Sequence, residues 1–255
     1  MDNTYKTPLL SVTQRAMARD MDVAWIQAWL NVNCGTNLEV DGVWGTSSRA
    51  EFISAMTCRN AKAITEDEMK SLVRRLGDVN DKRIKAIAKV ESAGSGWFNS
   101  GLPKILYERH KFWKHVKNAV NRVKAWYANP LAGDYTMDAN NNGINDSWEK
   151  LSLAIGKDPL AALMSVSIGK FQVMGEYYAQ CGYNHPIEML HACSRSEMAQ
   201  YELLVNYILN VAKILPAYNM LSTDAEKCRS FARAYNGAGY EKNRYHVKLA
   251  EAMKQ

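Results

Sequence analysis

The stretch KVESAGSGWFNSGLPKILYERHKFW, residues 89–113, places an acid where a charge is costly. Four residues share one helix face at the i, i+3, i+4, i+7 spacing: Ile84, Ile87, Ala88 and Glu91. Glu91 is therefore expected on the face turned to the core, in a last turn where the helix dipole disfavours negative charge. Both effects raise the pKa of a carboxyl group, as protonation of a glycosidic oxygen requires. A buried Glu held by an Arg or a backbone amide, or a helix end in solvent, gives the same pattern.

The composition is that of a globular protein. The chain has 255 residues, enough for one large domain or for a small and a medium one. Its 47% apolar and 23% charged residues exclude a disordered chain. The net charge of +6 favours a polyanionic partner, either nucleic acid, an anionic envelope or an acidic polymer. Five cysteines without CxxC spacing predict reduced thiols and no structural zinc.

The first segment, residues 1–62, has the pattern of a small helical unit. One predicted helix face carries Val23, Ile26, Trp29 and Leu30. The turn VDGVWG (40–45) follows, and a second helix with a hydroxyl cap is expected over 46–56, with Phe52, Ile53 and Met56 inward. The IQAWLN helix (26–31), this turn and the next helix resemble the peptidoglycan-binding repeat of cell-wall hydrolases. A generic helical hairpin is the alternative.

The second segment, residues 63–255, predicts a mostly helical unit of enzyme size. Capping boxes are expected at Thr65–Glu68 and Thr223–Glu226, and Gly77 is expected to end the first helix. Further helices are predicted from the cap at Asn80 or Asp81, over 111–127, near 158–166, over 196–215 and over 243–254. Strand signals are few.

Three ordered motifs identify a family. The stretch VESAGSGWFNSGLPKILYERHKFW (90–113) is followed by SIGKFQVMG (167–175) and FARAYNGAGY (231–240). In this order they resemble the N-acetylmuramidase family of phages and bacteria, and more broadly goose-type lysozymes and lytic transglycosylases. The resemblance covers nearly all of 63–255. It implies a mainly α, lysozyme-like catalytic domain after a three-helix peptidoglycan-binding domain (1–62), with Glu91 as the catalytic acid.

The resemblance also implies the residues around Glu91. Tyr235 and Asn236 would orient Glu91 or bond an N-acetyl group, although a packed Tyr and a C-cap Asn fit the pattern alone. Ser92, Ser167 and Gln172 would contact sugar or water. Apart from the resemblance, the small Gly94 and Gly96 would leave room for a bulky chain beside such an acid, and Trp97 and Phe98 offer surfaces for sugar rings.

Glu108 is the candidate for a second catalytic carboxylate. It would act as general base on water in an inverting hydrolysis. Arg109, His110 and Lys111 follow it directly, so an ion-paired structural carboxylate is the alternative.

Two other patterns compete for a function. DANNNGINDSWE (138–149) matches the ligand positions of an EF-hand loop, but no entering helix is expected and Asn145 stands where an apolar residue is usual. A polar Asn-Gly loop is the simpler interpretation, and no metal or other cofactor is expected. Lys111, Lys114, His115 and Arg122 form a basic stripe on the predicted helix over 111–127, which a solvated face also explains.

The sequence therefore predicts a phage endolysin that cleaves the β-1,4 bond between N-acetylmuramic acid and N-acetylglucosamine. A lytic transglycosylase forming 1,6-anhydro ends is the alternative, followed by a non-catalytic wall-binding or virion protein. The expected partner is bacterial peptidoglycan, with no nucleic acid, no membrane insertion and a monomeric chain. No signal peptide is apparent at the start, so the protein is expected in the host cytoplasm until it is released to the wall.

Overall fold

The computed structural model describes residues 5–91, 95–118 and 122–254. The first segment forms α1 (Val12–Met17), α2 (Met21–Cys34) and α3 (Thr46–Met56). The carboxylate of Asp20 caps α2, and Gly35 ends it in the left-handed region at φ 72°. The apolar face predicted for α2 is buried. The cap of α3 differs from the prediction, because Gly45 occupies it and makes no side-chain bond.

The rest of the described chain is mainly helical, as predicted. Its α-helices are α4 (Glu66–Arg75), α5 (Lys82–Glu91), α6 (Arg109–His115), α7 (Asp146–Ile155), α8 (Pro159–Met164), α9 (Pro186–Arg195), α10 (Glu197–Asn206), α11 (Leu215–Asn219), α12 (Arg229–Asn236) and α13 (Tyr245–Ala252). Short 3-10 turns occur at η2 (Gly169–Phe171), η3 (Gly175–Tyr177) and η5 (Ala238–Tyr240), and a π turn at η4 (Tyr207–Val211). None of the described helices has both the length and the apolarity needed to cross a membrane.

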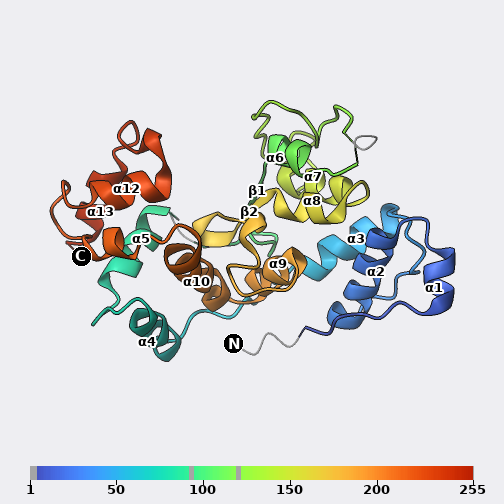
Figure 1. The fold of residues 1–255 in the computed structure, drawn as a ribbon, viewed down its shortest axis with the longest axis horizontal. Helices are drawn as coiled ribbons and strands as arrows, with labels where there is room; N and C mark the ends of the chain where they lie inside the picture. Colours follow the sequence, from blue (N-terminus) through green and yellow to red (C-terminus); the bar gives the residue numbers. More distant parts are fainter. Residues whose placement is uncertain (1–4, 92–94, 119–121, 255) are drawn as a thin grey trace.

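A small antiparallel sheet lies between two groups of helices. Its strands are ordered β1 (Ile105–Tyr107), β2 (Val166–Ile168) and β3 (Val173–Met174). Figure 1 shows α5, α12 and α13 on one side of this sheet and α6, α7 and α8 on the other. Tyr107, the last residue of β1, pairs with Val166 of β2. Glu108 follows Tyr107 directly and is the N-cap residue of α6. The sheet thus joins the first two motifs, and the third reaches the turn η2 through the bond from Tyr235 to the carbonyl of Phe171.

Local sequence signals set several helix ends. Thr65 and Glu68 form the predicted capping box, and Gly77 has φ 70° after α4. The side chain of Asn80 accepts from the backbone N–H of Lys82 at the start of α5. The Thr223–Glu226 box does not form, because the N–H of Glu226 bonds Asp224 Oδ1 over 3.0 Å. α12 begins only at Arg229.

The helix predicted over 111–127 is wrong, because α6 ends at His115. Val116 takes an extended conformation (φ −56°, ψ 117°), and the Arg122 side chain donates to its carbonyl over 2.8 Å. The chain then runs without an α-helix through the described residues 122–145 to the Asn145 cap of α7. This long connection brings polar residues back to α6.

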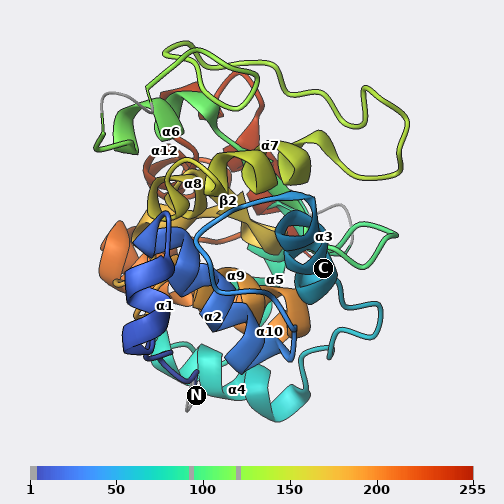
Figure 2. The same cartoon turned by 90° about the vertical axis from the view of Figure 1, so that its right-hand side faces the viewer.

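The first three helices share a core with the rest of the molecule. Phe52 of α3 lies 6.0 Å from the Trp148 ring of α7, and both side chains are fully buried in one continuous apolar cluster. Trp44 donates its Nε1–H to the carbonyl of Ser152 over 2.7 Å. Arg195 of α9 donates to carbonyls at the end of α3 and just after it. Figure 2 looks onto this side, with α2 and α3 in front of α9. A boundary at residue 62 stays a prediction, and any such boundary is crossed by core contacts.

Candidate active site

Glu91 is the last residue of α5 and is half-buried. Its helix buries Ile84, Ile87 and Ala88, as the spacing predicted. The hydroxyl of Tyr245, from α13, donates a hydrogen bond to Oε1 of Glu91. Burial raises the pKa of the Glu91 carboxyl group, and the bond from Tyr245 opposes this in smaller measure. The group is therefore an acid that holds its proton to higher pH than an exposed Glu.

Stacked aromatic rings form the wall beside Glu91. Tyr245 and Tyr235 are nearly parallel, with ring centroids 6.4 Å apart, and Tyr235 stacks on Phe231 at 5.3 Å. The Tyr235 hydroxyl donates to the carbonyl of Phe171 over 3.2 Å. Burial, followed by the charge of Glu91, raises the pKa of Tyr235 well above its ordinary value. Tyr235 thus supports Tyr245, which makes the direct contact with Glu91.

Tyr245 is a site residue that the sequence reasoning missed. It lies in the predicted last helix, and its neighbours Leu249 and Ala250 are buried with it. The available signal was the inward face of that helix, which does not reveal a contact with a residue 154 positions away.

Replacing Tyr245 with Phe tests its contact with Glu91. The bond lowers the pKa of Glu91, so its loss should move the alkaline limb of the kcat/KM profile to higher pH. The lost orientation should lower the maximal rate by about 10- to 100-fold. Tyr240→Phe is the control, since that hydroxyl bonds Glu241 instead. An alkaline limb displaced to lower pH would contradict the assignment.

Ser167 and Gln172 form a pair rather than two separate contacts. Ser167 is buried in β2 and donates its hydroxyl to Oε1 of Gln172 over 2.7 Å. Gln172 has φ 50° and donates its amide to the carbonyl of Gly169 over 2.8 Å. Gln172 is exposed, so its side chain is accessible from solvent. Ser167 therefore orients Gln172, and Gln172 is the member of the pair that can meet a substrate.

Gln200 fills the space beside two glycines. A Cβ at Gly96 would lie 1.9 Å from Gln200 Oε1, and one at Gly169 would lie 2.7 Å from Gln200 Cδ. The amide of Gln200 accepts from the N–H of Lys170 over 2.7 Å. The expectation that Gly96 leaves room for substrate is therefore wrong, because Gly96 makes room for this amide. Gly94 lies outside the described residues.

Trp97 and Phe98 lie in a pocket of about 590 Å³ with Arg59, Lys170 and Glu197. The Trp97 ring is fixed by a bond of 3.0 Å from Nε1 to the carbonyl of Ser194. Phe98 packs against the apolar core. Both rings are partly exposed, so a role as sugar surfaces stays a prediction.

Glu108 occupies the N-cap position of α6, but its side chain makes no capping bond. Its Oε2 instead accepts from the hydroxyl of Tyr135 over 2.7 Å. His110 Nδ1 lies 3.1 Å from the same oxygen, out of hydrogen-bond alignment. Arg109 bonds elsewhere, to Asp134 and to the carbonyl of Leu131. Glu108 is therefore held by a tyrosine, as Glu91 is.

Asn236 and Ser92 are the remaining predicted site residues, and the structure describes only the first of them. Asn236 is the exposed last residue of α12, one position after Tyr235. Ser92 lies outside the described residues. Glu91, Tyr245 and Tyr235 form one group, and the bond from Tyr235 to the carbonyl of Phe171 links it to the residue before Gln172. Gln172 in turn bonds Ser167 of β2, and Glu108 follows the neighbouring strand β1.

Comparison with known proteins shows which family the chain belongs to. The profile of the N-acetylmuramidase family matches residues 80–255, more than half of the chain. The chain belongs to the N-acetylmuramidase family. The crystal structure of the Burkholderia AP3 phage endolysin is similar to this muramidase, with a TM-score of 0.65 and 27% identity over 93% of this chain and 95% of that one. None of the curated proteins matches the chain. The chain is thus an enzyme, a muramidase that hydrolyses peptidoglycan, as its three motifs predicted.

The basic stripe of this muramidase is partly used within the fold. Lys111 Nζ and His115 Nε2 hold the two oxygens of Glu176, at 2.8 and 3.0 Å. Arg122 is not on α6, and Lys114 is exposed. The predicted single helix face is therefore wrong, because α6 is too short to carry it.

The EF-hand-like loop of the muramidase closes on itself. The amides of Asn140 and Asn142 donate to the carboxylate of Glu149 over 3.1 and 2.7 Å. Asp138 accepts from the N–H of Asn142 and of Gly143, at 3.0 Å each. Within the described ranges, no cluster of three or more His, Cys, Asp or Glu side chains is arranged to hold a metal ion.

Proposed function

We propose that this muramidase is an endolysin that cleaves the β-1,4 bond between N-acetylmuramic acid and N-acetylglucosamine, with Glu91 as the general acid. The observation that carries this proposal is the half-buried Glu91, whose pKa is raised beside the Tyr245 and Tyr235 rings. Glu91 donates its proton to the leaving oxygen while an oxocarbenium-like centre develops. Acid catalysis of this kind contributes about 10²- to 10⁴-fold.

Glu108 is proposed as the base that activates water on the opposite face of the sugar. Its contact with Tyr135 uses only Oε2. An ionised carboxylate has a second oxygen that can accept a proton from water. Glu108 follows β1 directly, and Ser167 lies on the neighbouring strand β2, opposite Leu106.

Substrate contacts are proposed for the exposed polar groups around these carboxylates. Gln172 and Asn236 present amides that can bond the N-acetyl groups of the glycan. Tyr235 is proposed to hold Tyr245 in place by stacking on it, and Ser167 to orient Gln172 through its hydrogen bond, without touching the substrate themselves. Ser92, adjacent to Glu91, stays a proposed contact from sequence alone.

The first three helices are proposed to bind peptidoglycan while packed against the catalytic part. Trp44 is engaged with Ser152 and Gly156, so binding would use other surfaces of these helices. We further propose a monomer that waits in the host cytoplasm until a membrane-opening partner gives it access to the wall. The net charge of +6 would favour the anionic wall.

The sugar found at the ends of the released glycan strands tests this function. Purified peptidoglycan is digested, reduced with borohydride and examined by mass spectrometry. The proposal predicts new reducing ends on N-acetylmuramic acid. Reducing ends on N-acetylglucosamine would contradict the bond assignment. Unreducible 1,6-anhydro ends would show a lytic transglycosylase, in which the C6 hydroxyl of the sugar replaces water.

A further inference from the structure

Tyr135 lies in the long connection between α6 and α7 and binds the second carboxylate of the site. Its hydroxyl donates to Oε2 of Glu108 over 2.7 Å, yet 48% of Tyr135 is exposed. Partial burial and the Glu108 carboxylate raise the pKa of Tyr135, and the protonated hydroxyl is the donor in this bond. Because the Tyr135 ring is exposed, core packing does not fix its position, and the contacts of the neighbouring residues become important.

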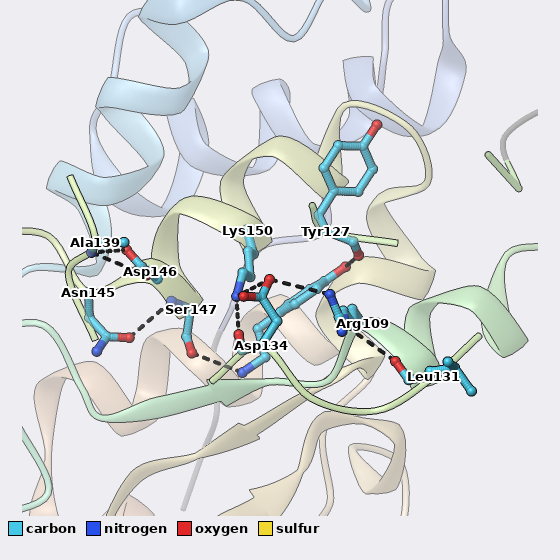
Figure 3. A network of polar contacts seen from close by, with 10 residues as sticks. Arg109, Tyr127, Leu131, Asp134, Ala139, Asn145, Asp146, Ser147 and Lys150 are labelled. Atoms are coloured by element: carbon cyan, nitrogen blue, oxygen red, sulfur yellow. Dashed lines mark hydrogen bonds and ion pairs between the residues drawn. The ribbon is translucent and has the colours of Figure 1, made fainter. Parts of the chain in front are cut away.

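A buried cation fixes the residue before Tyr135. Lys150 of α7 has a side-chain exposure of 3%, and its Nζ lies 3.2 Å from Oδ2 of Asp134. Lys150 also donates to the carbonyl of Asp134. Arg109 Nη1 lies 3.3 Å from the same carboxylate oxygen. Figure 3 shows Asp134 between these two cations.

The contacts of Lys150 and Arg109 with Asp134 form an anchor for the chain. The backbone of Asp134 itself is in a conformation that needs support. Asp134 has φ 64°, a left-handed conformation that is uncommon for residues other than glycine. Such a conformation persists where surrounding contacts determine it. Lys150 further lies 4.9 Å from the centroid of the Trp126 ring, which belongs to the same connection. The anchor thus fixes the chain directly beside Tyr135.

Glu108 uses its carboxylate for this contact and not for its helix. It occupies a cap position, where a side chain usually bonds the first helical N–H groups, but it makes no such bond. Oε2 faces Tyr135, and Oε1 accepts no hydrogen bond from a residue in the described ranges. The carboxylate is therefore oriented by one oxygen, with the other left for a ligand.

We propose that Tyr135 is a positioning residue for Glu108: its hydroxyl fixes Oε2, and the Asp134–Lys150–Arg109 anchor presets Tyr135, so that Oε1 is offered to the attacking water. The inference rests on the proposed function, in which Glu108 activates water. Holding a catalytic group in one orientation before substrate arrives saves the entropy that its ordering would otherwise cost in the transition state.

A double-mutant cycle tests whether Tyr135 acts through Glu108. The variants are Tyr135→Phe, Glu108→Gln and the pair, assayed on soluble glycan strands of peptidoglycan. Tyr135→Phe should lower kcat about tenfold with KM nearly unchanged, and in the Glu108→Gln background it should lower kcat by less than about twofold. Tyr127→Phe is the matched control on the same connection. Its ring contacts Phe112, and its hydroxyl bonds no residue of the described ranges.

Glycan binding supplies a second readout when Glu108→Gln is too slow to assay. In the inactive Glu91→Gln background, Tyr135→Phe should leave the Kd for the glycan strand unchanged. Weaker binding would overturn the inference, because Tyr135 would then contact the sugar itself.

Several other results of the double-mutant cycle would also contradict the role proposed for Tyr135. An equal loss in both backgrounds, no loss in the wild-type background, or full activity of Glu108→Gln would each overturn the inference. These results leave the muramidase function standing, since that function is judged by the product ends and by Glu91→Gln. Asp134→Asn should lower kcat in the same direction as Tyr135→Phe if the anchor presets the ring.

Discussion

Glu91→Gln should abolish the lysis of purified peptidoglycan while leaving the protein folded. Gln keeps the shape of the side chain, but its amide is too weak an acid to protonate the glycosidic oxygen. The loss should be at least about 10²- to 10⁴-fold in kcat, measured by release of reducing ends. Glu251→Gln is the matched control, because Glu251 lies exposed on α13, the helix that carries Tyr245.

The same variant should be at least as stable as the wild type at neutral pH. Burial raises the pKa of Glu91 in the folded state above its value in the unfolded chain. The stability that this group contributes is full below the unfolded pKa and is lost as pH rises through the folded pKa. Gln does not ionise, so the variant does not lose this stability as the pH rises. Each unit by which the Glu91 pKa differs between the folded and unfolded states corresponds to about 1.4 kcal/mol in the free energy of unfolding. Thermal unfolding at acid and neutral pH measures the difference, and a variant that is less stable only at neutral pH would contradict the account.

Phe52→Ala should destabilise the whole protein and not the first three helices alone. Phe52 is fully buried and contacts Trp44 and Trp148, which lie on the two sides of the predicted boundary. Removing a buried Phe costs about 3–5 kcal/mol. Calorimetry should show a single transition moved down by about 10 °C. Leu9→Ala is the control, since 93% of Leu9 is exposed.

Two separate transitions, with only one of them moved by Phe52→Ala, would contradict a shared core. That result would describe two independent domains whose contacts contribute little. A single transition would mean that the first three helices and the rest of the chain unfold together as one cooperative unit.

The local parts of the site follow from the sequence. The spacing from Ile84 to Glu91 sets the inward face of α5, and Thr65 with Glu68 sets the start of α4. Both depend on residues within two turns of one helix, where propensity and periodicity act directly. The order of the three motifs added the fold, because it identified a family.

The long-range parts do not follow from the sequence. Tyr245 reaches Glu91 across 154 residues, and Tyr135 reaches Glu108 across 27. No periodicity encodes such a pair. The helix predicted through Val116 failed because tertiary contacts, including the bond from Arg122, stabilise an extended residue there. The Thr223–Glu226 box failed because Asp224 competes for the N–H of Glu226.

A titration of the Glu91 carboxyl group shows whether burial keeps this acid protonated. The ¹³C resonance of this carboxyl is followed with pH by NMR and is assigned by its absence in Glu91→Gln. We expect a pKa above the ordinary value of about 4.3 for Glu, and a further rise in Tyr245→Phe. A Glu91 pKa at or below the ordinary value would contradict an acid kept protonated by burial.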